Sequence, residues 1–323
     1  MKSVNIRNFC KKTFRFGLFI PLSNLLITYG QGFLSHRMLT WFQNRRIKKI
    51  QTILDSYLSF PDILPEYHKS SCTEDAKVWF FWLQGEDNLP LLPKFCLESM
   101  RRYANGHEVV VLSADNYSQY VQIPESLIDK YRAGRIKAAH FADILRINIL
   151  AQQGGLWLDA TMLVTQKLPK EIFERPFFSI KTENKGYFVS QCRWAVFCLG
   201  AQKGSALFTL LSSLFEQYML KTDVFVDYFL FDNLIDMIYL RYPSIRQEID
   251  DVPMNNACVH DLEPVLCDEI DDKDLADILK ETYLFKLSYK SHTPDVLHQN
   301  TNNVYNKLMD LMVSDFHATH NGN

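Results

Sequence analysis

Hydrophobic residues between positions 77 and 112 fall into two short continuous runs separated by an amphipathic stretch. Lys77–Leu83 (KVWFFWL) and Val109–Leu112 are rich in aromatic and β-branched residues, as in fully buried strands. Between them, Leu91–Tyr103 places its apolar residues on one helical face. A strand, a helix and a strand in this order predict parallel strands joined by a crossover helix. The pattern therefore predicts an α/β fold with a mostly parallel central sheet.

A further helix and strand lie at the centre of the chain, on either side of Gly154-Gly155. The preceding amphipathic stretch carries Asp143 and Arg146 three residues apart, hence on one helical face at the edge of its apolar stripe. Glycine favours the position after a helix, so the pair predicts the helix end. The apolar run Leu156–Val164 predicts a buried strand that carries Asp159. Acidic residues at strand ends lie where open α/β sheets bind nucleotides.

The rest of the chain continues the alternation of helices and strands and has a helical start. Residues 38–68 are predicted to be helical, with the helix ending near Pro61 and Pro65, and to lead into the main domain. We therefore divide the chain into a basic helical extension and linker, 1–68, and an α/β domain, 69–323. Further predicted elements are helices over 126–132, 205–220, 227–240 and 268–279, and strands over 177–180 and 195–199.

Charge is distributed very unevenly. Residues 1–50 contain ten Lys or Arg and no Asp or Glu, whereas the remainder has 25 basic against 37 acidic residues. The uncharged stretch Phe16–Ser35 is apolar, but Pro21 and its glycines make it a poor spanning helix. Such a segment suits the headgroup region of an anionic membrane. The alternative is a solvated basic arm with a helix packed on the domain.

The sequence also bears on partners and compartment. Apolar rather than further basic residues fill the gap between the basic clusters, which argues against nucleic acid as a partner. The seven cysteines form no CxxC pair and suit a reducing compartment better than a disulfide framework. No small-residue cleavage site follows a short apolar core, as a signal peptide would require. We expect a protein peripheral on the cytoplasmic face of the plasma membrane.

Motifs of several enzyme classes are missing, and one resemblance is specific. The chain has no Gly-x-Gly-x-x-Gly after its first strand, no phosphate loop, no Gly-x-Ser-x-Gly and no His-Glu-x-x-His, which excludes common dehydrogenase, kinase, esterase and zinc protease motifs. KVWFFWLQG followed by AHFADILRINILAQQGGLWLDAT resembles the capsular polysaccharide synthesis family of glycosyltransferases, over roughly residues 75–295. That family is related to the sugar-binding-region transferases of glycosyltransferase family 32. The resemblance implies a GT-A fold.

The resemblance assigns the donor-binding residues. Trp82 would stack on the nucleotide base, with Gln84 at the strand-to-loop edge beside it; the alternative is that Trp82 belongs to the core. Asp143 would accept hydrogen bonds from ribose or sugar hydroxyls, and Arg146 would hold the carboxylates or the donor. The alternative for these two is a surface ion pair. Asp143, Arg146 and Asp159 are the expected catalytic residues.

Metal binding is the point at which the chain departs from the family pattern. Asp159 matches the first residue of Asp-x-Asp and would bind a divalent cation, Mn²⁺ or Mg²⁺, but the third position is Thr161, a weaker ligand. In similar enzymes a C-terminal loop closes over the diphosphate. Here that loop would supply Lys286 and Lys290 as diphosphate contacts and His292 as a further metal ligand, unless it is only solvated.

The resemblance implies a retaining transferase that uses a nucleoside-diphosphate sugar, UDP-sugar first, and extends a lipid-linked bacterial glycan. Retention without an evident protein nucleophile suggests attack from the face that the leaving group departs from. Two alternatives remain open. The departure at Thr161 fits an inactive membrane-bound scaffold with the same fold. A soluble transferase with a protein acceptor is the other.

Overall fold

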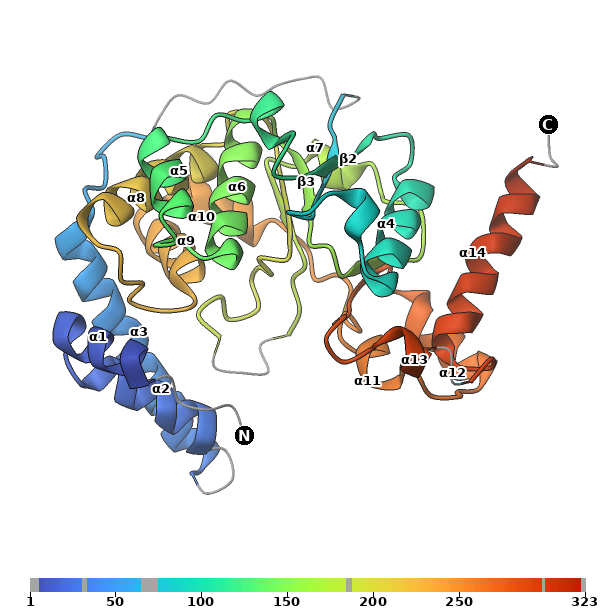
Figure 1. The fold of residues 1–323 in the computed structure, drawn as a ribbon, viewed down its shortest axis with the longest axis horizontal. Coiled ribbons are helices and arrows are strands. Elements are labelled where there is room, and N and C mark those ends of the chain that lie inside the picture. The colour runs from blue at the N-terminus through green and yellow to red at the C-terminus, as the bar shows by residue number, and fades with distance from the viewer. Residues whose placement is uncertain (1–5, 31–33, 65–74, 184–187, 298–299, 321–323) are drawn as a thin grey trace.

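The computed structural model describes residues 6–30, 34–64, 75–183, 188–297 and 300–320 (Figure 1). A central α/β body carries a helical extension at one end and a group of C-terminal helices at the other. The expected boundary at residues 68 and 69 lies outside the described residues. The predicted α/β class with a mostly parallel central sheet is confirmed.

The central sheet has five strands in the order β2-β1-β3-β6-β5. β1 runs parallel to β2 and β3, whereas β6 is antiparallel to both of its neighbours. A second, two-stranded antiparallel sheet pairs β4 with β7. The strands are β1 Val78–Phe81, β2 Val109–Leu112, β3 Gly155–Leu158, β4 Met162–Val164, β5 Phe177–Ser179, β6 Cys198–Ala201 and β7 Leu284–Lys286.

Helices cover the sheets and form both ends of the molecule. α6 packs on α8, α8 contacts α9, and α4 packs on β4. The helices are α1 Ile6–Phe16, α2 Phe19–Tyr29, α3 His36–Tyr57, α4 Leu91–Tyr103, α5 Glu125–Arg132, α6 Ala138–Gln152, α7 Glu171–Glu174, α8 Ala206–Lys221, α9 Leu230–Arg241, α10 Pro243–Asp250, α11 Leu262–Val265, α12 Asp272–Lys280, α13 Pro294–Leu297 and α14 Val304–His320.

Two glycines join α6 to β3, as the sequence predicts. Gly154 and Gly155 have φ angles of +68° and +93°, where other residues are strained. A Cβ on Gly155 would lie 2.3 Å from the carbonyl oxygen of Lys77, so the backbones of β1 and β3 approach only because the side chain is absent. This junction fixes α6 relative to the end of β3, and therefore Asp143 and Arg146 relative to Asp159.

The single strand predicted over Leu156–Val164 is wrong. The chain leaves the central sheet after Leu158, turns through Asp159–Thr161 and enters the second sheet as β4. The pattern does not reveal the break because both short strands are buried throughout. The strand predicted over 195–199 is also shifted, because Ala195 makes only an isolated bridge and β6 begins at Cys198.

The N-terminal extension is a set of three helices attached to the α/β body. α3 contacts both α8 and α9. Arg46 on α3 forms an ion pair with Asp227 in which both side chains are buried, and the Gln51 amide donates to Asp236 at 2.8 Å. Among the described residues, no helix has the length and apolar character needed to cross a membrane.

Candidate functional site

A cavity of about 520 Å³ opens where the central sheet meets the loop before α9 and the segment after β7. We call it the donor cavity. Eight of the nine site residues expected from the sequence line it: Trp82, Gln84, Asp143, Arg146, Asp159, Thr161, Lys286 and Lys290. They come from positions 82 to 290, so the fold gathers groups that are far apart in the chain.

Arg146 is the central cation of the donor cavity. Its side chain is buried, and one guanidinium nitrogen lies 2.9 Å from the Asp159 carboxylate and 3.9 Å from Asp143. The other nitrogen donates to the backbone carbonyl of Val196. The guanidinium also lies 5.1 Å from the centre of the Trp157 ring, a cation–π distance. The alternative of a solvated surface ion pair therefore fails for Arg146, because its side chain is buried and both terminal nitrogens have partners.

Asp159 is held between two cations at the turn between the sheets. Its Oδ1 accepts hydrogen bonds from Arg146 at 2.9 Å and from the Trp157 indole at 3.0 Å. Its Oδ2 lies 3.5 Å from the Lys286 ammonium. Burial alone would raise the pKa of Asp159, but Arg146 and Lys286 outweigh burial and hold that pKa below its ordinary value. Asp159 is therefore a carboxylate at neutral pH.

Lys286 occupies the position beside Asp159 where a metal ion would be expected. The β4–β7 pairing sets Lys286 opposite Met162, and its ammonium donates to the Thr161 hydroxyl at 2.5 Å. A divalent cation requires several oxygen ligands that are free to face it. Here Thr161 and both oxygens of Asp159 already face cationic or indole donors. These residues do not fit a divalent cation, so we assign no step to one.

His292, the expected further metal ligand, does not reach the donor cavity. Its Nε2 lies 3.2 Å from the Glu263 carboxylate, and its Nδ1 lies 3.2 Å from the Cys267 sulfur. Within the described ranges, no group of three or more His, Cys, Asp or Glu side chains is arranged to hold a metal ion. β7 thus contributes Lys286 to the cavity and the segment after it contributes Lys290, whereas His292 in that segment faces α11 and the residues that follow α11.

Trp82 packs against the core on one side and lines the edge of the donor cavity on the other. Trp79 and Phe80 are buried, whereas Trp82 is only partly buried. Its indole donates to the Asn88 carbonyl at 3.2 Å, and Tyr289 packs edge-on against it with ring centres 5.7 Å apart. Gln84, on the same loop, is exposed at the cavity. A fixed, partly exposed indole is suited to stacking on a planar ring.

Sequence reasoning assigned no role to the wall formed by the loop before α9 and its first turn. Tyr228, Phe231 and Asp232 line the donor cavity from this side. Burial raises the pKa of Asp232 to about 7; the Trp194 indole, which donates to it at 3.1 Å, opposes that shift, and the charge of Asp143 adds to it. Below that pH Asp232 is mostly neutral and adds little negative charge to the cavity. No local signal marks this wall, because only the packing of α9 brings it to the sheet.

Comparison with known proteins gives partial matches to glycosyltransferases. A segment of 97 residues is 32% identical to the O-glycosyltransferase braB of Annulohypoxylon truncatum, covering 27% of this chain and 23% of that protein. A segment of 130 residues is 23% identical to the O-glycosyltransferase PaGT of Phomopsis amygdali, covering 35% of this chain and 32% of that protein. The matches thus span less than a third of either curated relative.

A solved structure and a family profile complete the comparison. The PaToxG glycosyltransferase structure aligns with 77% of this chain and 99% of its own, at a TM-score of 0.35 and 14% identity. The profile of the family described as capsular polysaccharide synthesis protein matches residues 32–308, which is most of the chain. The match starts a few residues before α3 and ends within α14. The chain belongs to the capsular polysaccharide synthesis protein family.

Proposed function

We propose that this protein is a retaining glycosyltransferase that moves a sugar from a nucleoside-diphosphate sugar to a lipid-linked glycan. The observation that carries the proposal is the convergence of Arg146 and Lys286 on Asp159 inside a cavity whose rim holds Trp82. A diphosphate needs cations, a base needs a flat apolar surface, and sugar hydroxyls need acceptors such as Asp143. The cavity offers all three.

The chemistry assigned to the chain is stabilisation of the leaving group. The ammonium of Lys286 and the guanidinium of Arg146 would neutralise charge that develops on the departing diphosphate. α6 also begins at this cavity with Ala138–His140, and no side chain caps its N-terminus. Its first N–H groups and the positive end of its dipole would add to that stabilisation. Retention follows if the acceptor hydroxyl attacks beside the departing diphosphate, which takes up its proton.

The direct test is a screen of nucleotide sugars for release of nucleoside diphosphate. We expect one donor, with a UDP-sugar tested first, to be hydrolysed slowly without acceptor and faster with lipid-linked glycan. The anomeric configuration of the product, read by NMR, should match that of the donor. A protein that binds no nucleotide by calorimetry would be the scaffold rather than the enzyme. A product with inverted configuration would contradict the retaining mechanism but not the glycosyl transfer itself.

Trp82→Ala is expected to weaken binding of the nucleoside diphosphate by about ten- to a hundredfold, because base–aromatic stacking contributes ~1–3 kcal/mol. Trp82→Phe should retain most of the affinity, since a smaller ring still stacks. Calorimetric titration of both variants with UDP checks the pair. Equal affinity of Trp82→Ala and the unsubstituted protein would place the base elsewhere.

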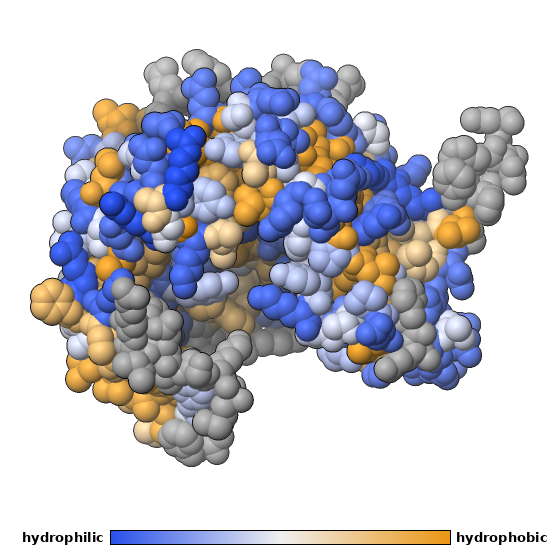
Figure 2. Space-filling view, in the orientation of Figure 1, coloured by the Kyte–Doolittle hydropathy of each residue, from blue (hydrophilic) through white to orange (hydrophobic). Residues whose placement is uncertain are grey.

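For the compartment, we propose peripheral attachment to the cytoplasmic face of the plasma membrane through α1–α3. Large apolar side chains are exposed on this helical extension, including Leu18, Leu22 and Trp41, and Figure 2 shows the apolar surface over this end of the molecule. Arg45, Lys48 and Lys49 line a shallow depression with Phe19 and Trp41. Apolar side chains beside basic ones match an anionic lipid surface. The six described cysteines are free thiols, as a reducing compartment favours.

Leu18→Gln combined with Leu22→Gln is expected to lower partitioning into phosphatidylserine-containing vesicles by about tenfold or more, because each side chain loses apolar burial in the lipid. The matched control changes two exposed apolar residues on the α/β body, Leu240→Gln and Met254→Gln. Vesicle flotation measures both. If the two double variants partition alike, the extension is not the membrane-binding surface.

A further inference from the structure

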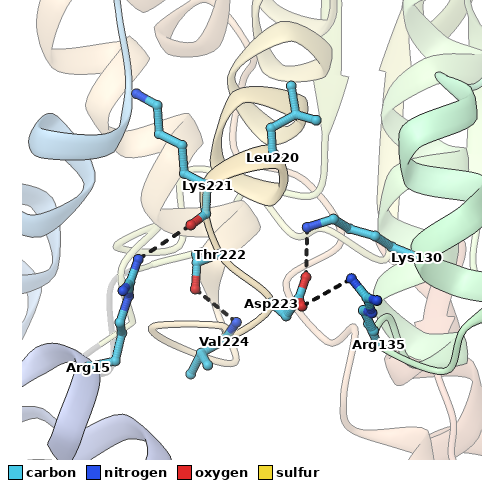
Figure 3. A pocket seen from close by; sticks show the side chains of 8 residues that line it. All are labelled: Arg15, Lys130, Arg135, Leu220, Lys221, Thr222, Asp223 and Val224. Atoms are coloured by element: carbon cyan, nitrogen blue, oxygen red, sulfur yellow. Dashed lines mark hydrogen bonds and ion pairs between the residues drawn. The ribbon is translucent and has the colours of Figure 1, made fainter.

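A second cavity, of about 700 Å³, lies between α1, the turn before α6 and the loop before α9. We call it the basic cavity. Its cationic lining residues are Lys11, Lys12, Arg15, Arg135 and Lys137. It continues into a smaller cavity of about 470 Å³, with which it shares Arg15, Arg135, Asp223 and Val224 (Figure 3).

The carboxylates of the basic cavity already have cationic partners. Asp223 lies 2.7 Å from Lys130 and 3.6 Å from Arg135, and Figure 3 shows these two side chains reaching it from the same side. Asp227 is in the buried ion pair with Arg46. Lys130 and Arg46 are not among the lining residues, so the two carboxylates leave most of the five lining cations uncompensated.

Three lysines carry most of this excess of positive charge. In the described part of the chain, Lys11 and Lys137 are exposed and form neither an ion pair nor a side-chain hydrogen bond. Lys12 lies deeper. Burial lowers its pKa; the charge of Asp227 opposes that effect, and the nearby positive charge of Arg46 adds to it. A bound anion would pair with the ammonium groups of all three lysines.

The basic cavity adjoins the donor cavity directly. Ala139, His140 and Tyr228 line both of them. The uncapped N-terminus of α6 lies at this junction and presents N–H groups and a positive dipole end to an anion. A ligand held by its anionic group in the basic cavity would therefore direct an attached group past His140 and Tyr228 toward the donor.

We propose that the basic cavity binds the phosphate or diphosphate group of the lipid-linked acceptor and so positions the acceptor sugar for transfer. This inference rests on the proposed function. The charge of the cavity selects a phosphate, and the opening to the donor cavity places the next sugar beside the reacting bond. Phe14 lies on α1 with Lys11 and is 95% exposed, so it would offer the lipid chain an apolar contact beside the cavity.

The test compares two double variants that remove the same charge. With saturating UDP present to occupy the donor cavity, Lys11→Gln with Lys137→Gln should weaken binding of inorganic pyrophosphate to the full chain by about tenfold or more, because charge-assisted hydrogen bonds are lost. Lys273→Gln with Lys280→Gln, on exposed positions of α12, should leave it unchanged. Lys11→Arg with Lys137→Arg should restore binding. Circular dichroism checks that all variants fold. Unchanged pyrophosphate affinity in the first variant overturns the proposal.

Two further measurements distinguish an acceptor phosphate from a phospholipid headgroup, and a failure of this proposal from a failure of the proposed function. If the first variant loses binding to phosphatidylserine-containing vesicles but keeps its pyrophosphate affinity, the lysines serve a phospholipid headgroup surface, and the acceptor subsite is refuted. UDP affinity should be equal in the first variant and the unsubstituted protein, since the donor cavity is intact. An unsubstituted protein that binds pyrophosphate but no nucleotide would contradict the proposed function while leaving an anion site at these lysines.

Discussion

Asp159→Asn is expected to lower donor turnover by about a hundred- to a thousandfold, the loss typical of removing one electrostatic element from a site built around a developing charge. The substitution keeps the shape of the side chain and removes its charge. Arg146 and Lys286 then lose the carboxylate between them that holds both in place. Arg146 is buried, so the variant also leaves a poorly compensated cation whose nearest remaining carboxylate is Asp143, at 3.9 Å.

Release of nucleoside diphosphate measures this effect, with circular dichroism to show that the fold survives. Asp143→Asn should lose turnover as well, because its carboxylate faces the same cavity. The control is Asp277→Asn, an exposed aspartate on α12. If Asp159→Asn turns over the donor nearly as fast as the unsubstituted protein, the donor does not bind in this cavity.

Lys286→Met is expected to lower turnover by a similar factor of about a hundred or more, and added Mn²⁺ should not restore it. The ammonium group of Lys286 lies next to Asp159 and Thr161, where a cation would face the diphosphate. For the same reason EDTA should leave the turnover of the unsubstituted protein unchanged. We thus expect Lys286 to take the role that the Asp-x-Asp resemblance gives to a divalent cation, because Asp159 already accepts from or pairs with other donors.

UDP affinity provides a second measurement that does not depend on turnover. It should be the same in EDTA and in Mn²⁺ for the unsubstituted protein, and lower in both for Lys286→Met. Lys286→Arg, which keeps the charge, should bind UDP more tightly than Lys286→Met. Affinity that appears only with Mn²⁺ would show that a metal displaces the lysine, and the ordinary metal-assisted mechanism would then hold.

Local pattern predicts much of this fold because most elements differ clearly in period. Leu91–Tyr103 and Val109–Leu112 begin and end where the sequence predicts. The division of Leu156–Val164 between two sheets is not predictable in this way. It depends on pairing of β4 with β7, more than a hundred residues later, and both halves are equally apolar. Long-range pairing leaves no local periodicity to detect.

The residues of the donor cavity also fall into those that the local sequence predicts and those that only long-range packing brings to the site. Asp143, Arg146 and Asp159 can be placed together from one helix, one glycine pair and one strand end, all within a short stretch. Lys286 enters only through the resemblance, and its place beside Thr161 requires the second sheet. The wall at Tyr228 and Asp232 has no sequence signal, because the packing of α9 alone brings it to the cavity.

The buried ion pair between Arg46 and Asp227 makes the helical extension unsuited to exchange as a separate module. Removing the Arg46 side chain while α3 still covers Asp227 would leave that carboxylate buried without its cation, at a cost of about 3–5 kcal/mol, a large share of the stability of an ordinary domain. Asp227 directly precedes Tyr228 in the donor cavity wall. A chimera that replaces α1–α3 with another anchor would therefore need a matching cation at position 46, and any tilt of α3 would be transmitted to the donor cavity.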